Sequence, residues 1–122
     1  MKSKLFYFVI FSIFLLSACS RDKVFVEILS PKDGEVFSVN ESIIIRVDAS
    51  TVKGFISQVE LNVETLEPQK MVKKPYEFEI PARAFDPYTW GGKDTLFRYI
   101  SVTAYNSKGD IAGDVIDIRI TK

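Results

Sequence analysis

The stretch YISVTAYNSKGD, from Tyr99 to Asp110, decides the fold together with the VIDIRI stretch that follows it. Apolar and polar side chains alternate along both stretches with a period of two residues. Such alternation is typical of a β-strand that buries one face and exposes the other. The first stretch ends in NSKGD at 106–110, which contains the glycine and small polar residues that a reversal of the backbone needs. The sequence therefore predicts a β-hairpin in this part of the chain.

The same period of two recurs from Val24 onward, and Met71 with Val72 fits one further short strand. The alternating apolar positions are Val26 and Ile28; Ile43, Ile45, Val47 and Ala49; Val59, Leu61 and Val63; and Tyr76, Phe78 and Ile80. Turn signals separate these runs at SPKDGE (30–35), TVKG (51–54) and LEPQ (66–69). About seven short strands at this spacing predict an all-β fold, an antiparallel β-sandwich.

Residues 1–18, MKSKLFYFVIFSIFLLSA, have the composition of a secretory signal. Lys2 and Lys4 precede an apolar run from Leu5 to Leu16. This run is shorter than the roughly 20 residues that a membrane-spanning helix requires. A basic start, a short apolar run and small residues at its end predict a cleaved signal peptide.

The four residues Leu16-Ser17-Ala18-Cys19 resemble the lipobox of bacterial lipoproteins. This resemblance implies cleavage before Cys19 and a diacylglyceryl group on its sulfur. Cys19 is the only cysteine of the chain, so a thioether-linked lipid accounts for it better than a disulfide. Two or three acyl chains exceed the single chain that gives only marginal anchoring. We therefore expect the protein to be attached to a membrane through Cys19.

The segment after the lipobox predicts how close the folded part lies to that membrane. Residues 19–23 form a lipidated cysteine and a linker, and the four residues from Ser20 to Lys23 span at most about 14 Å. Ser20 is not the aspartate that resembles an inner-membrane retention signal. We therefore expect a bacterial cell-envelope location, at the outer membrane if the source is Gram-negative.

Several motifs of the mature chain resemble the bacterial Ig-like domain. They are VEILSPKDGEVF, SIIIRVDAS, ISQVELNV, KPYEFEIP, YISVTAYNSKGD and VIDIRI, in this order. The resemblance covers nearly all of 24–122 and implies an immunoglobulin-like sandwich without the disulfide of antibody domains. The chain departs from the family pattern in two places, between Val63 and Lys74 and in a long connection after Pro81. The family is a scaffold and not an activity, so function must come from particular residues.

Composition excludes several classes of function. The chain has no histidine, which removes imidazole bases, Ser-His and Cys-His nucleophile systems and the usual zinc sites. Removing Lys2 and Lys4 with the signal leaves 14 basic and 16 acidic residues, a net charge of about −2. A binder of nucleic acid needs a basic stripe, and the sequence has none. We expect no nucleic-acid partner, no metal, no cofactor and no enzymatic activity.

Acidic side chains are the remaining candidates for chemistry. Glu60 with Glu64, and Glu77 with Glu79, lie on the same faces of predicted strands, as glycoside hydrolysis would need. Alternating charge on a solvent-exposed face explains them more simply. A calcium site formed by three aspartates lacks the spacing of a calcium-binding loop, and its candidates are Asp48, Asp110 and Asp114.

The strongest candidate for a binding site is the connection ARAFDPYTWGGKD, residues 82–94. It is longer than most connections in compact domains and contains the only tryptophan, Trp90. Phe85, Tyr88, Trp90 and Lys93 are the candidate ligand-binding residues. Aromatic side chains of such a loop either contact a ligand or fold back to plug the open end of the sandwich. Because the linker is short, we expect this loop to lie at the end that points away from the membrane.

The sequence therefore predicts a lipid-anchored, non-catalytic Ig-like module of the cell envelope that binds a protein. The alternative is a glycan-binding module in which Trp90 and Tyr88 stack on sugar rings.

Overall fold

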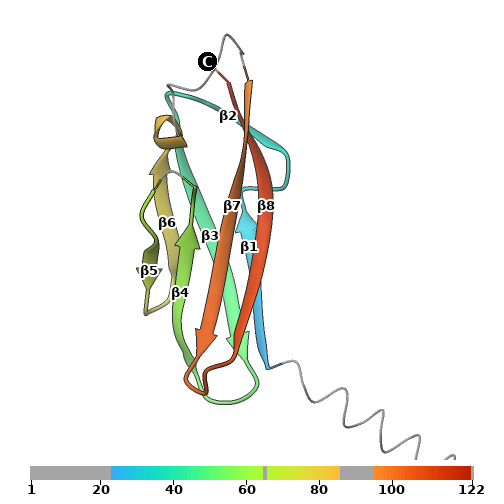
Figure 1. Cartoon of the computed structure of the whole chain (residues 1–122), viewed down its shortest axis with the longest axis vertical. Coiled ribbons are helices and arrows are strands. Elements are labelled where there is room, and N and C mark those ends of the chain that lie inside the picture. Colours follow the sequence, from blue (N-terminus) through green and yellow to red (C-terminus); the bar gives the residue numbers. More distant parts are fainter. Residues whose placement is uncertain (1–22, 65, 86–94, 122) are drawn as a thin grey trace, which may run out of the picture.

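The computed structural model describes residues 23–64, 66–85 and 95–121, which form two β-sheets packed face to face (Figure 1). The first sheet has the order β1-β3-β6. Its strands are β1 (Val24–Ser30), β3 (Ser42–Thr51) and β6 (Tyr76–Pro81). The second sheet has the order β2-β8-β7-β4-β5. Its strands are β2 (Glu35–Ser38), β8 (Ile111–Thr121), β7 (Thr95–Asn106), β4 (Ile56–Asn62) and β5 (Gln69–Met71). The predicted β-sandwich is confirmed.

The C-terminal hairpin is the longest pairing in the structure. β7 and β8 pair antiparallel from Thr95 opposite Thr121 to Tyr105 opposite Ile111. The backbone reverses at 106–110, where Gly109 has a φ of 88° that side chains with a Cβ rarely adopt. The predicted hairpin is confirmed. Of the short strand expected at Met71 and Val72, Met71 is the last residue of β5 and Val72 lies just outside it.

One strand was not predicted. β1 ends at Ser30 in the first sheet, and β2 begins only five residues later, in the second sheet. β2 pairs in parallel with the end of β8, from Glu35 opposite Ile118 to Ser38 opposite Thr121. This pair is parallel, whereas the other strand pairs of the predicted antiparallel sandwich are antiparallel. Four residues are too few to display a period of two, which is why the strand escaped the sequence analysis.

The core lies between the sheets and is built from the inward positions of every long strand. The alternating positions predicted from the sequence are buried on β3, β4, β6, β7 and β8. The side chains with no exposed surface are Ile43, Ile45, Val59, Ile100, Val102, Ala104, Ile118 and Ile120. Burial also raises the pKa of Tyr76, at the start of β6, above its usual value. Among the described residues, Asn106 is the only polar side chain in the buried class.

The two ends of the sandwich differ (Figure 1). At the basal end, Lys23 leads into β1, and the 51–55 and 106–110 loops lie beside it. The Val52 amide donates to the Lys23 carbonyl at 2.9 Å, and the Ser107 amide donates to the Phe55 carbonyl at 2.8 Å. At the distal end lie the short 3₁₀ helix η1 (Ala82–Phe85) and the first residue of β7. Both loops therefore lie at the end where the chain enters the sandwich.

The 30–35 segment lies beside β8 and not at the tip of the sandwich. The chain crosses from the first sheet to the second between β1 and β2, and it passes next to Asp117 of β8. There the Gly34 amide donates to the Asp117 carbonyl at 2.7 Å. Within the described residues, no helix is both long enough and apolar enough to span a membrane.

Replacing a core isoleucine of β8 tests this packing. Ile118→Ala removes a side chain with no exposed surface, so we expect the free energy of unfolding to fall by about 2–5 kcal/mol. Ile111→Ala, on the same strand but 63% exposed, should change it by less than about 0.5 kcal/mol. Urea unfolding measures both variants, and equal losses would contradict the assignment of the inward face.

Candidate functional site

The structure buries one of the four candidate ligand-binding residues. Phe85, the last residue of η1, is 1% exposed and belongs to the core. The Arg98 guanidinium of β7 donates through Nε to the Phe85 carbonyl at 3.3 Å. Phe85 therefore closes the distal end of the sandwich and is not available to a ligand. Of the two alternatives for the aromatic residues of this loop, Phe85 follows the second and plugs the open end of the sandwich. Burying its ring against the apolar core lowers the free energy of the folded state more than leaving it in water would.

The other sequence-predicted site residues lie outside the described part of the chain. These are Tyr88, Trp90 and Lys93, and the lipidation site Cys19. They stay predictions. The structure does describe the two residues that flank the 86–94 segment, Phe85 and Thr95, and both lie at the distal end.

The outer face of the five-stranded sheet displays aromatic side chains that the sequence analysis did not single out. On β7, Leu96 and Ile100 point into the core, whereas Phe97 and Tyr99 are 63% and 65% exposed. Because neighbouring strands share their faces, the outward side chains of β8 lie next to them: Arg119 pairs with Phe97 and Asp117 with Tyr99. The two rings are therefore exposed on one face of the sheet.

Three more side chains extend this surface. The Arg119 guanidinium carbon lies 5.3 Å from the centre of the Phe97 ring, within the range of a cation–π interaction. Val36 of β2 pairs with Arg119, and Val115 of β8 lies two positions from Asp117 on the same face. Both valines are more than half exposed. We call this surface the aromatic face, and its members are Val36, Phe97, Tyr99, Val115 and Arg119.

A signal for the aromatic face is present in the sequence. In the stretch LFRYI at 96–100, large apolar residues occupy both odd and even positions, and therefore both faces of a strand. Alternation from Ile100 onward is enough to predict the strand, and it assigns no role to Phe97 or Tyr99. A strand that needs only one apolar face has no structural use for two exposed rings, and exposed apolar clusters mark interaction sites.

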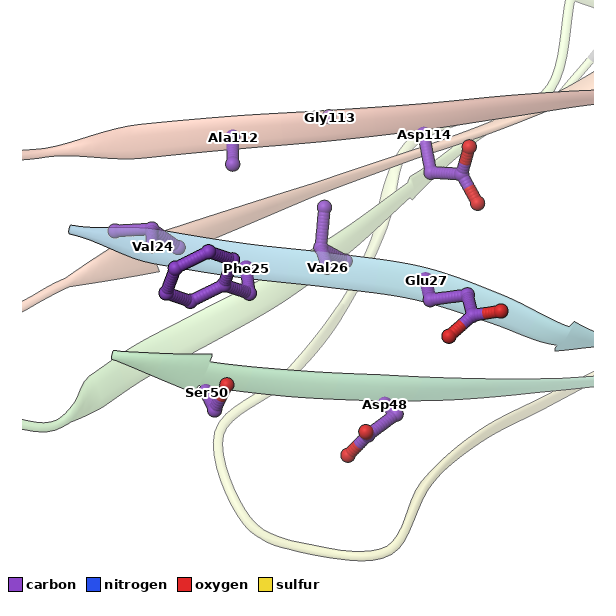
Figure 2. Close-up of a pocket in the computed structure, with 9 residues that line it drawn as sticks. All are labelled: Val24, Phe25, Val26, Glu27, Asp48, Ser50, Ala112, Gly113 and Asp114. Atoms are coloured by element: carbon purple, nitrogen blue, oxygen red, sulfur yellow. The ribbon is translucent and has the colours of Figure 1, made fainter. Parts of the chain in front are cut away.

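A groove of about 590 Å³ lies between β1 and β8 (Figure 2). Its acidic lining residues are Glu27, Asp48 and Asp114. Glu27 and Asp48 are direct cross-strand partners and point to the same side. Asp114 instead bridges the two strands: its carboxylate accepts a hydrogen bond from the backbone amide of Ile28 in β1 at 2.8 Å. A charged side chain placed on a strand edge in this way hinders the addition of a further strand.

The calcium hypothesis is not supported by this arrangement. Asp48 and Asp114 line the same groove, but Asp110 lies in the 106–110 loop, where its carboxylate accepts the Asn106 amide at 3.1 Å. Within residues 23–64, 66–85 and 95–121, no three acidic, histidine or cysteine side chains are placed to hold a metal ion.

The glutamates considered for hydrolysis have surface roles. Glu77 forms an ion pair with Arg46 at 2.9 Å on the outer face of the three-stranded sheet. Glu60 lies 4.0 Å from Lys70 on the other sheet. Glu77 and Glu79 lie along β6 as expected, whereas Glu64 lies in the turn after β4 and so does not share a strand with Glu60. In each pair a cation lies beside one member, as on a solvent-exposed surface.

Comparison with known proteins places the chain in a family. Residues 25–95 match the family model described as bacterial Ig domain. The chain belongs to this family. Its fold resembles that of the fibronectin(III)-like modules of CbhA from Clostridium thermocellum, with a TM-score of 0.62 and 22% identity over 79% of this chain and 94% of that one. Modules with these folds are typically non-catalytic.

A second structural match is more distant. It is a β-glucosidase from Listeria innocua in complex with glucose, with a TM-score of 0.39 and 16% identity. The match covers 81% of this chain but only 16% of the glucosidase chain. Comparison with curated proteins gave no match.

Two phenylalanines test the different roles assigned to aromatic residues. Phe85→Ala opens the distal end of the core, so we expect the free energy of unfolding to fall by about 3–5 kcal/mol. Phe97→Ala removes an exposed ring and should cost less than about 1 kcal/mol. Chemical unfolding of both variants provides the comparison. A small effect of Phe85→Ala would mean that its ring does not close the sandwich.

Proposed function

We propose that this protein is a lipid-anchored module of the bacterial cell envelope that binds another protein through its aromatic face. The observation that supports the binding function is the exposure of Phe97 and Tyr99 on a sheet whose opposite face already supplies the core. The lipobox supports the anchor. The Ig family supports a role in binding rather than catalysis.

The chemistry of the aromatic face suits a protein partner. Tyrosine and arginine are enriched among the residues that dominate protein interfaces, and Tyr99 and Arg119 occupy neighbouring positions here. Val36 and Val115 add apolar area on either side. Asp117 pairs with Tyr99 and supplies an exposed charge that would fix the orientation of a partner.

The position of the face agrees with the proposed anchor. Phe97 and Tyr99 lie near the distal start of β7, whereas Lys23, which follows the lipobox by four residues, lies at the basal end. A protein tethered at Cys19 would therefore hold the aromatic face away from the bilayer, accessible to a partner.

The anchor is tested by mass spectrometry and fractionation. We expect the mature protein to begin at Cys19 and to carry the mass of two or three acyl chains. Cys19→Ser should abolish the added mass and release the protein from the membrane fraction, whereas Ser20→Ala should not. An unmodified Cys19 in the native protein would contradict the anchor.

The binding function is tested by photo-crosslinking in intact cells. A photoreactive residue replacing Val115 should give a discrete protein adduct that identifies the partner. Tyr99→Ala and Phe97→Ala should each weaken binding of that partner by about tenfold or more, because central aromatic residues dominate interface energies. Binding is then measured with the purified proteins.

Phe25→Ala is the matched control for these variants. Phe25 is 51% exposed, but it lies on the three-stranded sheet, so its loss should leave binding unchanged. Equal effects of Phe25→Ala and Phe97→Ala would contradict the assignment of the face.

The glycan alternative has its own measurement. If the module binds a saccharide through Trp90 and Tyr88, saccharides should protect Trp90 fluorescence from quenching, and Trp90→Ala should abolish binding. Protein adducts without any effect of saccharides would favour the protein partner.

A further inference from the structure

The basal end exposes two large apolar side chains that the core does not use. Val52 and Phe55, in the loop between β3 and β4, are 69% and 66% exposed. They are the two most exposed of the large apolar side chains among the described residues. Their loop lies beside Lys23, where the chain enters the sandwich.

A network centred on Asn106 fixes the backbone of this end. Asn106 is 3% exposed and donates to Thr51 Oγ1 at 3.1 Å and to the Asp110 carboxylate at 3.1 Å. Its own side-chain oxygen accepts the amides of Lys108 at 3.1 Å and Asp110 at 2.8 Å. Thr51 Oγ1 in turn donates to the Lys23 carbonyl at 2.8 Å. One buried amide thus ties together both loops and the start of β1.

The two loops also interlock directly. The Phe55 amide donates to Ser107 Oγ at 3.1 Å, and the Ser107 amide donates to the Phe55 carbonyl at 2.8 Å. Gly54 has a φ of 70°, and a Cβ at this position would overlap Ser107 Oγ. Because the backbone on both sides of its side chain is held, Phe55 is fixed in an outward position and is not a side chain that failed to find the core.

Basic side chains surround these apolar tips. Lys53 and Lys108 are exposed in the two loops, and Lys23 lies beside them. The acidic residue of these loops, Asp110, is engaged by Asn106. On the flank of this end, a cavity of about 450 Å³ is lined by Phe55, the 64% exposed Val72, Lys73 and Lys74 among others. This end is basic although the mature chain has a small net negative charge.

We propose that the basal end docks onto an anionic lipid surface. Val52 and Phe55 enter the boundary between headgroups and acyl chains, while Lys53, Lys108 and Lys23 lie on lipid phosphates. Exposed apolar side chains ringed by lysines are the features that bind proteins to membrane interfaces. The inference rests on the proposed anchor at Cys19, which would hold Lys23 within about 14 Å of the bilayer. Because about 14 Å is the limit for a fully extended linker, the domain can approach to within the roughly 8–10 Å over which anionic lipid attracts lysine.

Docking would change how the aromatic face is presented. A lipid attached through a short linker holds the domain near the bilayer but leaves its orientation free. A second contact through the basal end would hold the strands of the sandwich upright. It would direct the distal end, with Phe97 and Tyr99, away from the surface.

Photo-crosslinking to lipid in intact cells tests this proposal. p-Benzoyl-phenylalanine replacing Phe55 should give an adduct with the mass of a phospholipid. The same residue replacing Phe97, which is 63% exposed against 66% for Phe55, is the matched control at the other end and should give none. A second probe replacing Val52 should repeat the result at 55.

Charge variants separate the electrostatic part of the contact. Lys53→Glu with Lys108→Glu should lower the yield of lipid adduct at position 55 several-fold. Lys53→Arg with Lys108→Arg keeps the charge and should preserve the yield. Equal yields in the two double variants would overturn the role of the lysines.

The same samples report the state of Cys19 independently. An acylated Cys19 without lipid adducts at positions 52 and 55, or with protein adducts there, would overturn docking and leave the anchor intact. Lipid adducts at these positions on a protein with an unmodified Cys19 would support docking and overturn the anchor.

Discussion

The structure depends on the burial of two apolar sheet faces against each other. Each long strand gives alternate side chains to this contact, and Ile43, Ile45, Ile100 and Ile118 retain no exposed surface. The period of two then obliges every other side chain to face solvent. An apolar residue at such a solvent-facing position adds no buried area to the core. The exposed rings of Phe97 and Tyr99 are therefore not explained by the packing of the sandwich.

The two ends of the sandwich are closed by different interactions. Phe85 and the Arg98 guanidinium cover the distal end, where an aromatic ring fills the space between the sheets. Hydrogen bonds centred on Asn106 close the basal end, so that no large side chain is needed there. Phe55 can therefore point outward at the basal end, whereas Phe85 cannot at the distal end.

The arrangement suits a tethered binding module better than an enzyme. Carboxylates lie on both sheets of the described structure, where Glu77 and Glu60 form ion pairs and Asp114 accepts a backbone amide. The proposed contacts are instead apolar and basic side chains on exposed surfaces. In this interpretation one end meets the lipid and the sheet face near the other end meets the partner, with the rigid sandwich fixing their separation.

The sequence by itself determined the positions of the long strands, the sandwich and the C-terminal hairpin, because alternation and turn chemistry are local properties of the chain. It also yielded the lipobox, which the described residues do not include. Only the tertiary structure decided that Phe85 is buried, that Phe97 joins Arg119 and Val36, and that Asn106 holds Thr51 and Asp110 together. The parallel strand β2 was likewise hidden in four residues. Most of these features depend on which segments lie side by side, and residues such as Thr51 and Asn106, which are 55 positions apart along the chain, carry no local sign that they will meet.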